Sequence, residues 1–566
     1  MRSIGPRLLR VVGVGGAVSL VVVAVALLLA PLLVLLATVA TGLPDHPTLR
    51  TIATVLAPQN LQAIWQTLRI SLGAVVVAGV VGVPAAIAVQ RTDVRGATVL
   101  GALLAVPLAI PSYLLAFAFR AAFDDRIGLL SFVSVVVGDI DSAGGISVVL
   151  GVSLLPLVVL RLRATLSSID GALEEAARTA GASALRALLD VTVPLCVPSV
   201  VSSLVLVFAA SAAAFGVPML LGLAANEPVV VVTTRITVAL QSGSATAIND
   251  ALGLSVALAT LSGLAFAIPA FFAAGAVVVS GKAARPMRLS LGAARWPTTL
   301  VLWSAVIVLV IVPLACLVLQ GLTLHAGGGV GLDNVGLHHV VDVLRRAEVR
   351  AAARTSAVLA IVAAGVIVVF AVVVVVAKRR VDKRWQLVFS GLTRLVELTY
   401  ALPGTVVAVA LILTFAAELR LIVVERVTLV LALGGTTALL LLAYVVKEAA
   451  LGFRAVDEAL DQLHPCLEEA ARLAGAGPVR AFVDVTLPLL RPHLVAAAVA
   501  VALPCFTELT MSVLLQAPGT STLGVVLFSL YEYGDPQQAM ALAAVLVVVA
   551  LAAQGLILRL RRAPAA

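Results

Sequence analysis

Residues 174–198 of this chain read EEAARTAGASALRALLDVTVPLCVP, and residues 468–492 read EEAARLAGAGPVRAFVDVTLPLLRP. The two stretches match at a constant offset of 294 (468 minus 174), with 16 identities in 25 positions and no gap. Elsewhere the two halves of the chain share mainly hydrophobicity, so composition alone does not produce such agreement. The repeat indicates that one structural unit occurs twice and has the same role in both places.

Each copy of the repeat predicts two short helices separated by a glycine. The first helix contains good helix formers and begins with two glutamates, whose charge favours the positive end of the helix dipole. Gly181 and Gly475 follow, at the position where a left-handed residue ends a helix. Pro194 and Pro488 then mark the start of an apolar run, because proline fits the first turn of a helix.

The chain around the repeat is strongly apolar. Of its 566 residues, 61% are hydrophobic and only 12% are charged, and its mean hydropathy is +1.15. A soluble protein of this length needs far more charge to cover its surface. A membrane-spanning helix needs about 20 apolar residues, and runs of that kind recur along the sequence. The sequence therefore predicts an all-α polytopic membrane protein.

The apolar runs predict about twelve transmembrane helices, arranged as two homologous six-helix halves. We expect a first half at 1–280 with its repeat loop at about 163–198, a basic cytoplasmic linker at 281–297, and a second half at 298–566 with its loop at about 448–492. The expected spans are 12–40, 67–89, 98–119, 147–161, 199–222, 251–280, 298–321, 355–377, 395–416, 427–446, 494–515 and 538–558.

The formal charge of +9 follows from topology. The basic residues form short clusters between apolar runs, as the positive-inside rule requires, and an N-terminus and C-terminus in the cytoplasm place all four lysines on that side. A nucleic-acid surface would be continuous and interleaved with aromatic residues, and aromatics are only 4% of the chain. The pattern excludes a nucleic-acid partner. The four lysines that this topology places in the cytoplasm are Lys282, Lys378, Lys383 and Lys447.

The repeated loop resembles the EAA loop of the permeases in binding-protein-dependent ABC importers of type I. In that family the first short helix of the loop is a coupling helix, which sits in a groove on the ATP-hydrolysing subunit. Each copy here carries one additional glutamate ahead of the Glu-Ala-Ala pattern. The resemblance implies a coupling role for Glu174, Glu175, Ala176, Ala177 and Gly181, and for Glu468, Glu469, Ala470, Ala471 and Gly475.

Shorter motifs outside the loops resemble the fused permeases of the ferric-iron and thiamine type. The resemblance implies ferric iron as the expected cargo and leaves thiamine, polyamines and phosphonates open. The motifs of this type are Ala401-Leu402-Pro403-Gly404-Thr405, Phe215-Gly216-Val217-Pro218, and Glu508-Leu509 through Pro518-Gly519-Thr520 with Thr522-Leu523. The wider permease family is resembled by Gln66-Thr67-Leu68, the looser Arg354-Thr355-Ser356, and Val83-Pro84-Ala85-Ala86 before Arg91-Thr92-Asp93.

The resemblance also implies the partners and the location. These are two copies of an ABC ATPase subunit, an extracytoplasmic substrate-binding protein and the bacterial cytoplasmic (inner) membrane. The only near match to a phosphate-binding Walker A loop ends at Lys282-Ala283, with one residue too many and alanine in place of serine or threonine. No catalytic motif appears. We therefore expect a chain that is not an enzyme and holds no cofactor, with ATP and Mg bound by the partner ATPase.

An ion-gradient-driven secondary transporter is the alternative, because such proteins also contain two repeats. It would require intramembrane charges in both halves, and Glu508 is the one convincing case. Charge at that depth costs at least about 2.5 kcal/mol and usually marks a pathway, a pair or a gate. The 294 offset places Ala214 opposite Glu508. Two roles stay open, a translocation-pathway carboxylate and a structural pair.

Other polar residues suggest simpler roles. Asp333, His338 and His339 lie in a predicted extracytoplasmic loop, and adjacent histidines on a helix cannot both face one ion, so we expect no metal site there. Asp124-Asp125-Arg126 and Asp139-Ile140-Asp141 are expected in solvated loops. The four cysteines are far apart and indicate neither disulfides nor zinc; they are Cys196, Cys316, Cys466 and Cys505.

Overall fold

The structure is a computed structural model, and it describes residues 30–38 and 54–562 with short gaps. The described part is almost entirely helical, with one two-stranded antiparallel hairpin, β1 (Leu419–Val424) and β2 (Val427–Leu431). The fold class predicted from the sequence is confirmed. The gaps are 126–127, 134–138, 224, 226, 243, 274–287, 326–331, 382, 416–418, 425–426, 432 and 465.

Contacts divide the chain into two compact units. Unit 1 comprises residues 1–49, 347–526 and 549–566, and unit 2 comprises 50–346 and 527–548. Residues 298–346, which the sequence assigns to the second half, thus pack with unit 2. The boundary at 281–297 separates the two homologous halves of the sequence, and it stays a prediction. Residues 281–287 of that linker lie outside the described part.

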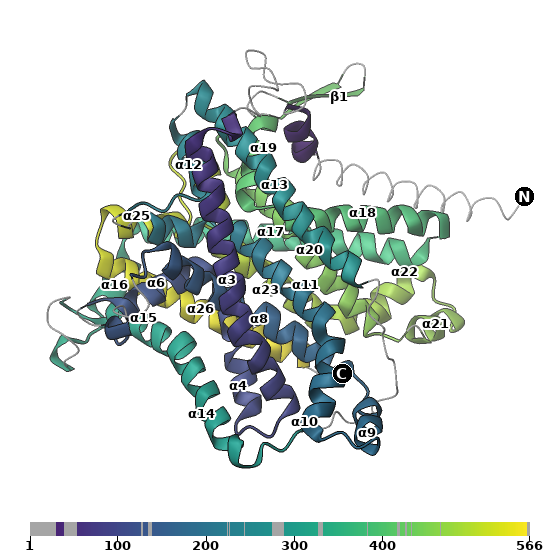
Figure 1. Ribbon diagram of the computed structural model, residues 1–566. Helices are drawn as coiled ribbons and strands as arrows, with labels where there is room; N and C mark the ends of the chain where they lie inside the picture. Colours follow the sequence, from purple (N-terminus) through teal and green to yellow (C-terminus); the bar gives the residue numbers. More distant parts are fainter. Residues whose placement is uncertain are drawn as a thin grey trace, which may run out of the picture. The chain divides into compact units, whose positions relative to one another are not determined.

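Unit 2 is organised around the long helix α3, which packs along α8 and α11 (Figure 1). α12 is a short helix that the apolar pattern did not predict. The helices of this unit are α3 (Pro58–Arg91), α4 (Ala97–Leu103), α5 (Val106–Ala109), α6 (Ser112–Phe123), α8 (Ala143–Ser168), α9 (Gly171–Thr179), α10 (Ala184–Ala187), α11 (Val193–Ala212), α12 (Val232–Ser242), α13 (Ala245–Ala273), α14 (Arg295–Val306), α15 (Val312–Leu322) and α16 (His338–Arg345).

Unit 1 is organised around α17, which packs against α20 and α23. The last two helices, α25 (Leu523–Tyr533) and α26 (Pro536–Arg562), are divided between the two units. The other helices of unit 1 are α17 (Ala347–Arg380), α18 (Lys383–Ala401), α19 (Gly404–Phe415), α20 (Thr437–Asp461), α21 (Cys466–Leu473), α22 (Pro478–Ala481), α23 (Leu487–Phe506) and α24 (Thr510–Leu515).

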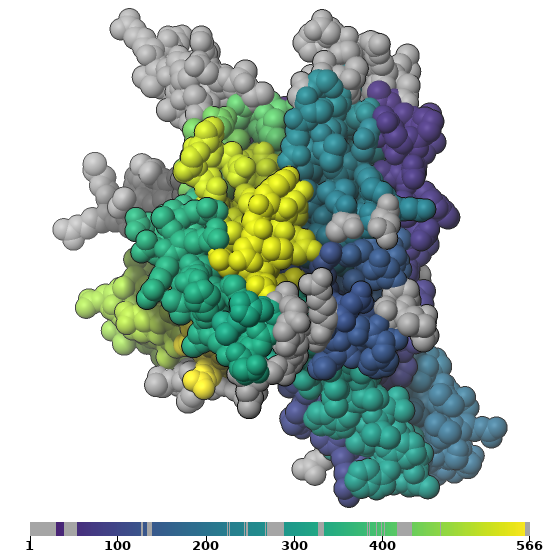
Figure 2. All heavy atoms as spheres, turned by 90° about the vertical axis from the view of Figure 1, so that its left-hand side faces the viewer, coloured from purple at the N-terminus to yellow at the C-terminus, as the bar shows by residue number. Residues whose placement is uncertain are grey.

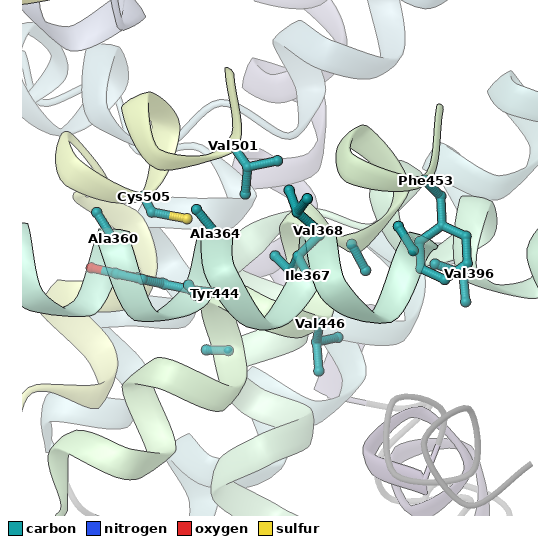
Figure 3. Packing of buried hydrophobic residues seen from close by; sticks show 14 of the residues in the cluster. Ala360, Ala364, Ile367, Val368, Val396, Tyr444, Val446, Phe453, Val501 and Cys505 are labelled. Carbon is teal, nitrogen blue, oxygen red and sulfur yellow. The ribbon is translucent and has the colours of Figure 1, made fainter. Parts of the chain in front are cut away.

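The core of unit 1 depends on small residues of α17. Ala360, Ala364 and further alanines of this helix are buried and let α20 and α23 approach closely. Figure 3 shows Cys505 of α23 beside Ala364, and Tyr444 of α20 along the same stretch of α17. In a membrane, helix association depends on such close packing because lipid tails are as apolar as the helix surfaces.

Within the described residues, eight helices are long and apolar enough to cross a membrane, or nine if one bent pair is counted as a span. The bent pair corrects the predicted span 98–119, because the chain turns by 110° between Ala109 and Ser112. Pro111 lies at the bend, and proline cannot donate the hydrogen bond that would continue the helix. The predicted first span, 12–40, lies mostly outside the described residues, which there are 30–38.

Four further predicted spans need correction. The span 199–222 is broken after α11 ends at Ala212, and residues 218–222 form the separate short π-helix η3. The span 395–416 is broken between α18 and α19, where Pro403 interrupts the helix. The span 427–446 begins as strand β2, and α20 starts only at Thr437, after a turn in which Gly435 has a φ of 67°. The span 494–515 is broken between α23 and α24. Apolar runs predicted membrane segments here, but hydropathy does not show a break inside a run.

Candidate functional site

From α10 and α22 onward, the two repeated loops have the same secondary structure, residue for residue. α10 and α22 begin at Ala184 and Pro478, and five-residue π-helices follow directly, η2 (Leu188–Thr192) and η7 (Phe482–Thr486). α11 and α23 then begin one residue before the predicted prolines and both run for 20 residues. Short π-helices are rare and often mark functional sites. The repeat is therefore a repeat of structure as well as sequence.

The glycines end the first helix of each loop as predicted. Gly181 has a φ of 95° and Gly475 a φ of 94°. In the first copy the Gly181 amide donates to the carbonyl of Arg178, and the amide of Ala182 donates to that of Ala177. The second copy has the equivalent two bonds. These bonds are the Schellman motif, which requires a residue with positive φ.

Glu174 lies in the first loop but does not face outward. Its side chain is only 3% exposed, and its Oε1 atom lies 3.4 Å from Nη1 of Arg91, which is fully buried. Thr192 of η2 also donates a hydrogen bond to this oxygen. Arg91 is the last residue of α3. Arg91 therefore holds Glu174 inward, away from the exposed face of the loop.

Glu468 makes the equivalent contacts in the second loop. Nη2 of Arg380, the last residue of α17, lies 2.6 Å from its Oε1 atom, and Thr486 of η7 donates to its Oε2 atom at 3.5 Å. This pair is about one-third exposed. Sequence reasoning missed both arginines. The signal was present, because Arg91-Thr92-Asp93 and Arg380-Val381-Asp382 repeat the pattern Arg-x-Asp at an offset of 289 (380 minus 91).

The outer face of each loop combines charged, small and apolar side chains. Glu175 and Ala176, with their counterparts Glu469 and Ala470, are exposed, whereas Ala177 and Ala471 are half-buried. Apolar side chains are exposed at three equivalent positions in the two copies, and exposed apolar patches rimmed by polar residues often mark a site where a partner binds. These positions are Leu173 and Leu467, Leu185 and Val479, and Leu189 and Val483.

Glu508 lies in the break between α23 and α24. Its carboxylate accepts hydrogen bonds from the backbone amides of Met511 and Ser512, each at 2.9 Å, and from the Ser512 hydroxyl at 3.1 Å. The hydroxyl of Tyr444 lies 2.9 Å from the same serine oxygen. The carboxylate thus supplies acceptors to amides that a helix break leaves without partners. The pathway role of Glu508 stays a prediction.

The assignment of Lys447 to the cytoplasmic side required this residue to lie at the end of a span, and it does not. It lies inside α20, and its ammonium donates to the backbone carbonyls of Tyr400 and Leu402, at the break between α18 and α19. A cation at a helix C-terminus interacts favourably with the helix dipole. The two broken helices of unit 1 are therefore each stabilised by a charge of the matching sign, Lys447 at one and Glu508 at the other.

A cavity of about 500 Å³ lies in unit 2 beside Arg120. Beside it the ring of Phe117 from α6 packs edge-on against the ring of Tyr531 from α25; Figure 2 views the molecule from the side on which C-terminal residues, in yellow, are exposed. Arg120 lies over the ring of Tyr531 and 2.7 Å from Asp141. Asp141 is therefore not simply solvated; burial raises the pKa of its carboxyl, and Arg120 opposes that rise. The polar lining residues are Arg120, Asp124, Gln320, Thr323, Tyr531, Glu532 and Gln537.

The histidines of α16 have separate partners. His338 lies 2.9 Å from Asp342, and His339 lies 3.2 Å from the carbonyl of Leu324. In the part of the chain that the structure describes, no group of three or more histidine, cysteine, aspartate or glutamate side chains could hold a metal ion. Cys196, Cys316 and Cys505 are buried and Cys466 is exposed.

The long helices α3 and α17 each anchor a distant backbone amide. Thr67 accepts a hydrogen bond from the amide of Val232, and Ser356 accepts one from the amide of Leu523, both at 2.9 Å. The offset of 289 therefore pairs Thr67 with Ser356. The alignment of Thr67 with Thr355, which the looser sequence motif suggested, is wrong by one residue.

Comparison with known proteins identifies one family twice in the chain. The model of the family described as "Binding-protein-dependent transport system inner membrane component" matches residues 78–281 and 386–562. The chain is 35% identical over 121 residues to the 2-aminoethylphosphonate transport system permease protein of Salmonella paratyphi A, covering 21% of this chain and 46% of that one.

Two other relatives carry different names. The molybdate/tungstate transport system permease protein of Pyrococcus abyssi is 25% identical over 158 residues, 28% of this chain and 59% of its own. The ferric transport system permease protein of Actinobacillus pleuropneumoniae is 27% identical over 158 residues, 28% of this chain and 21% of its own. The chain thus spans about half the length of the first relatives that it matches.

Proposed function

The chain belongs to the family of binding-protein-dependent transport system inner membrane components, and from this premise we propose that it is the transmembrane permease subunit of an ABC importer. In this proposal both permease halves are in one polypeptide, and they form the pathway for a ligand that an extracytoplasmic binding protein delivers. The two matches to the family, one on each side of residues 282–385, support the presence of two halves.

We propose that the repeated loops dock on two copies of a separate ABC ATPase. The observation that carries this proposal is the exposed apolar surface at three equivalent positions of each loop, beside small residues at Ala176 and Ala470. A partner can approach small residues closely and cover exposed apolar ones. Because the sequence has no Walker A loop, ATP and Mg would bind to that partner.

We propose ferric iron as the first cargo to test, on the motif resemblance and on the ferric relative. Relatives named for 2-aminoethylphosphonate and molybdate or tungstate make these the competing cargos. Uptake of radioactive iron, molybdate and 2-aminoethylphosphonate into cells that express the transporter distinguishes them. Iron uptake that neither competitor reduces supports the assignment, and uptake of another compound alone replaces it.

Docking on an ATPase is tested by affinity purification of the chain from its host membranes. We expect an ABC ATPase to co-purify at two copies per chain, and Ala176→Trp with Ala470→Trp to abolish its recovery, because a bulky side chain blocks close approach. Gln59 is exposed at the other end of α3, and Gln59→Trp would test whether bulk alone has this effect. Uptake driven by an ion gradient without ATP would instead support a secondary transporter.

The orientation that places the loops in the cytoplasm is tested by cysteine labelling. In a Cys466→Ser background, His338→Cys should react with an impermeant thiol reagent in intact cells, whereas Lys378→Cys should react only after the membrane is opened. His338 is at the start of α16, and Lys378 is near the end of α17, a helix of 34 residues that would separate the two positions across the membrane. Labelling of Lys378→Cys in intact cells would reverse the orientation.

A further inference from the structure

We propose that Arg91 and Arg380 are positioning residues that transmit the movement of the repeated loops to the membrane helices. The inference rests on the proposed docking of these loops on an ATPase. It assigns the transmission to two side chains outside the loops, each of which ends a helix of 34 residues. A loop that moves with its ATPase would then displace α3 or α17 directly.

The same three groups meet in both copies, although the chain brings them together at different offsets. An arginine at the end of the long helix contacts the first glutamate of the loop, and a threonine of the following π-helix donates to that glutamate. The helices repeat at an offset of 289, whereas the loops repeat at 294. The chain between the arginine and the glutamate is therefore five residues longer in the second copy (294 minus 289), yet the same contact forms. This indicates that the contact itself is needed.

The turn after Arg91 extends this connection to a second membrane helix. The amide of Leu289 donates to the carbonyl of Arg91 at 2.7 Å, and the amide of Leu291 donates to Asp93 at 3.0 Å. The guanidinium of Arg95 lies 4.3 Å from the centre of the Trp296 ring, near the start of α14. The first loop, α3 and α14 thus all connect to residues 91–95.

The pair of Arg91 and Glu174 is more deeply buried than the pair of Arg380 and Glu468, and it is therefore harder to separate. The side chains of Arg91 and Glu174 are 0% and 3% exposed, whereas those of Arg380 and Glu468 are 33% and 29% exposed. Within the described residues, the guanidinium nitrogens of Arg91 have no hydrogen-bond partner, so the charge of Glu174 is its main compensation. Separating a buried pair leaves an uncompensated charge. The loop and the end of α3 therefore move together.

The test replaces the buried pair of Arg91 and Glu174 as a whole, in the transporter assembled with its ATPase and binding protein. Arg91→Met alone leaves a buried carboxylate unpaired and should reduce the yield of folded complex. Arg91→Met with Glu174→Leu substitutes an apolar pair of similar size, which such sites often tolerate. We expect this double variant to recover the yield of folded complex, while stimulation by the binding protein and uptake fall about tenfold, as when a coupling between sites is lost.

Full stimulation and uptake in the well-folded double variant would overturn the proposal and leave the pair a structural role only. If the double variant gives no folded complex, Arg380→Met with Glu468→Leu provides the same test at the pair that is about one-third exposed, with a smaller loss expected. Arg235→Met with Asp250→Leu, an ion pair between α12 and α13, is the matched control and should change neither readout. Failure of the wild-type chain to bind an ATPase would instead refute the proposed function.

Discussion

Replacing Gly181 or Gly475 with valine is expected to remove most of the stimulated ATP hydrolysis and uptake while leaving the membrane helices folded. Both glycines have a φ near 95°, where a side chain is strained, and a β-branched residue most of all. A Cβ at either position would meet no atom within 4 Å. The cost, about 1–3 kcal/mol, is therefore one of backbone conformation and falls on the loop alone.

A penalty of that size changes the population of the loop conformation by roughly 5- to 150-fold, and the membrane helices are untouched. Gly477→Val is the matched control, because Gly477 is in the same loop with a φ of −67° and no atom within 4 Å of a Cβ. The assay compares stimulated ATP hydrolysis and uptake with the amount of detergent-extracted complex. Normal transport by both Gly181→Val and Gly475→Val would refute the coupling assignment.

The loops could be predicted closely because their determinants are local. A glycine at the end of a helix and a proline at the start of the next act through their own backbone, and a gap-free repeat shows both twice. Gly181, Gly475 and the starts of α11 and α23 were therefore predicted from the sequence. These features follow from neighbours in the chain, which a single sequence displays.

The inward turn of Glu174 and the breaks in the spans could not be predicted in the same way. Whether a glutamate faces a partner or a buried arginine depends on Arg91, which is distant in sequence and reaches the loop only when α3 packs against α8 and α11. The break between α18 and α19 is likewise supported by Lys447 of α20. Hydropathy reports how apolar a run is, and it does not show the distant charge that stabilises a break.

Glu508 is the second position at which a large effect is expected. Glu508→Leu removes the acceptors of two backbone amides, at Met511 and Ser512, and leaves these donors buried or half-buried without partners. Each unsatisfied donor costs about 1–3 kcal/mol. The loss falls on α24, which has six residues and contacts α19 and α20. We expect a several-fold lower yield of folded protein.

Glu508→Gln separates the structural role from the pathway role. The amide oxygen of glutamine can still accept from one backbone donor, so the yield should stay close to that of the wild type, and uptake should survive if capping of α24 is the whole role. If the carboxylate also lines the pathway of a cationic cargo, uptake should fall while assembly and basal ATP hydrolysis remain normal, because attraction between unit charges in a partly dry cavity is worth several kcal/mol.

Ser512→Ala is the control, since it removes the hydroxyl bond to Glu508 and keeps both backbone amides. Measuring uptake and detergent-extracted complex for all three variants distinguishes these outcomes: a normal yield of Glu508→Leu would refute the capping role, and full uptake by Glu508→Gln would refute the pathway role.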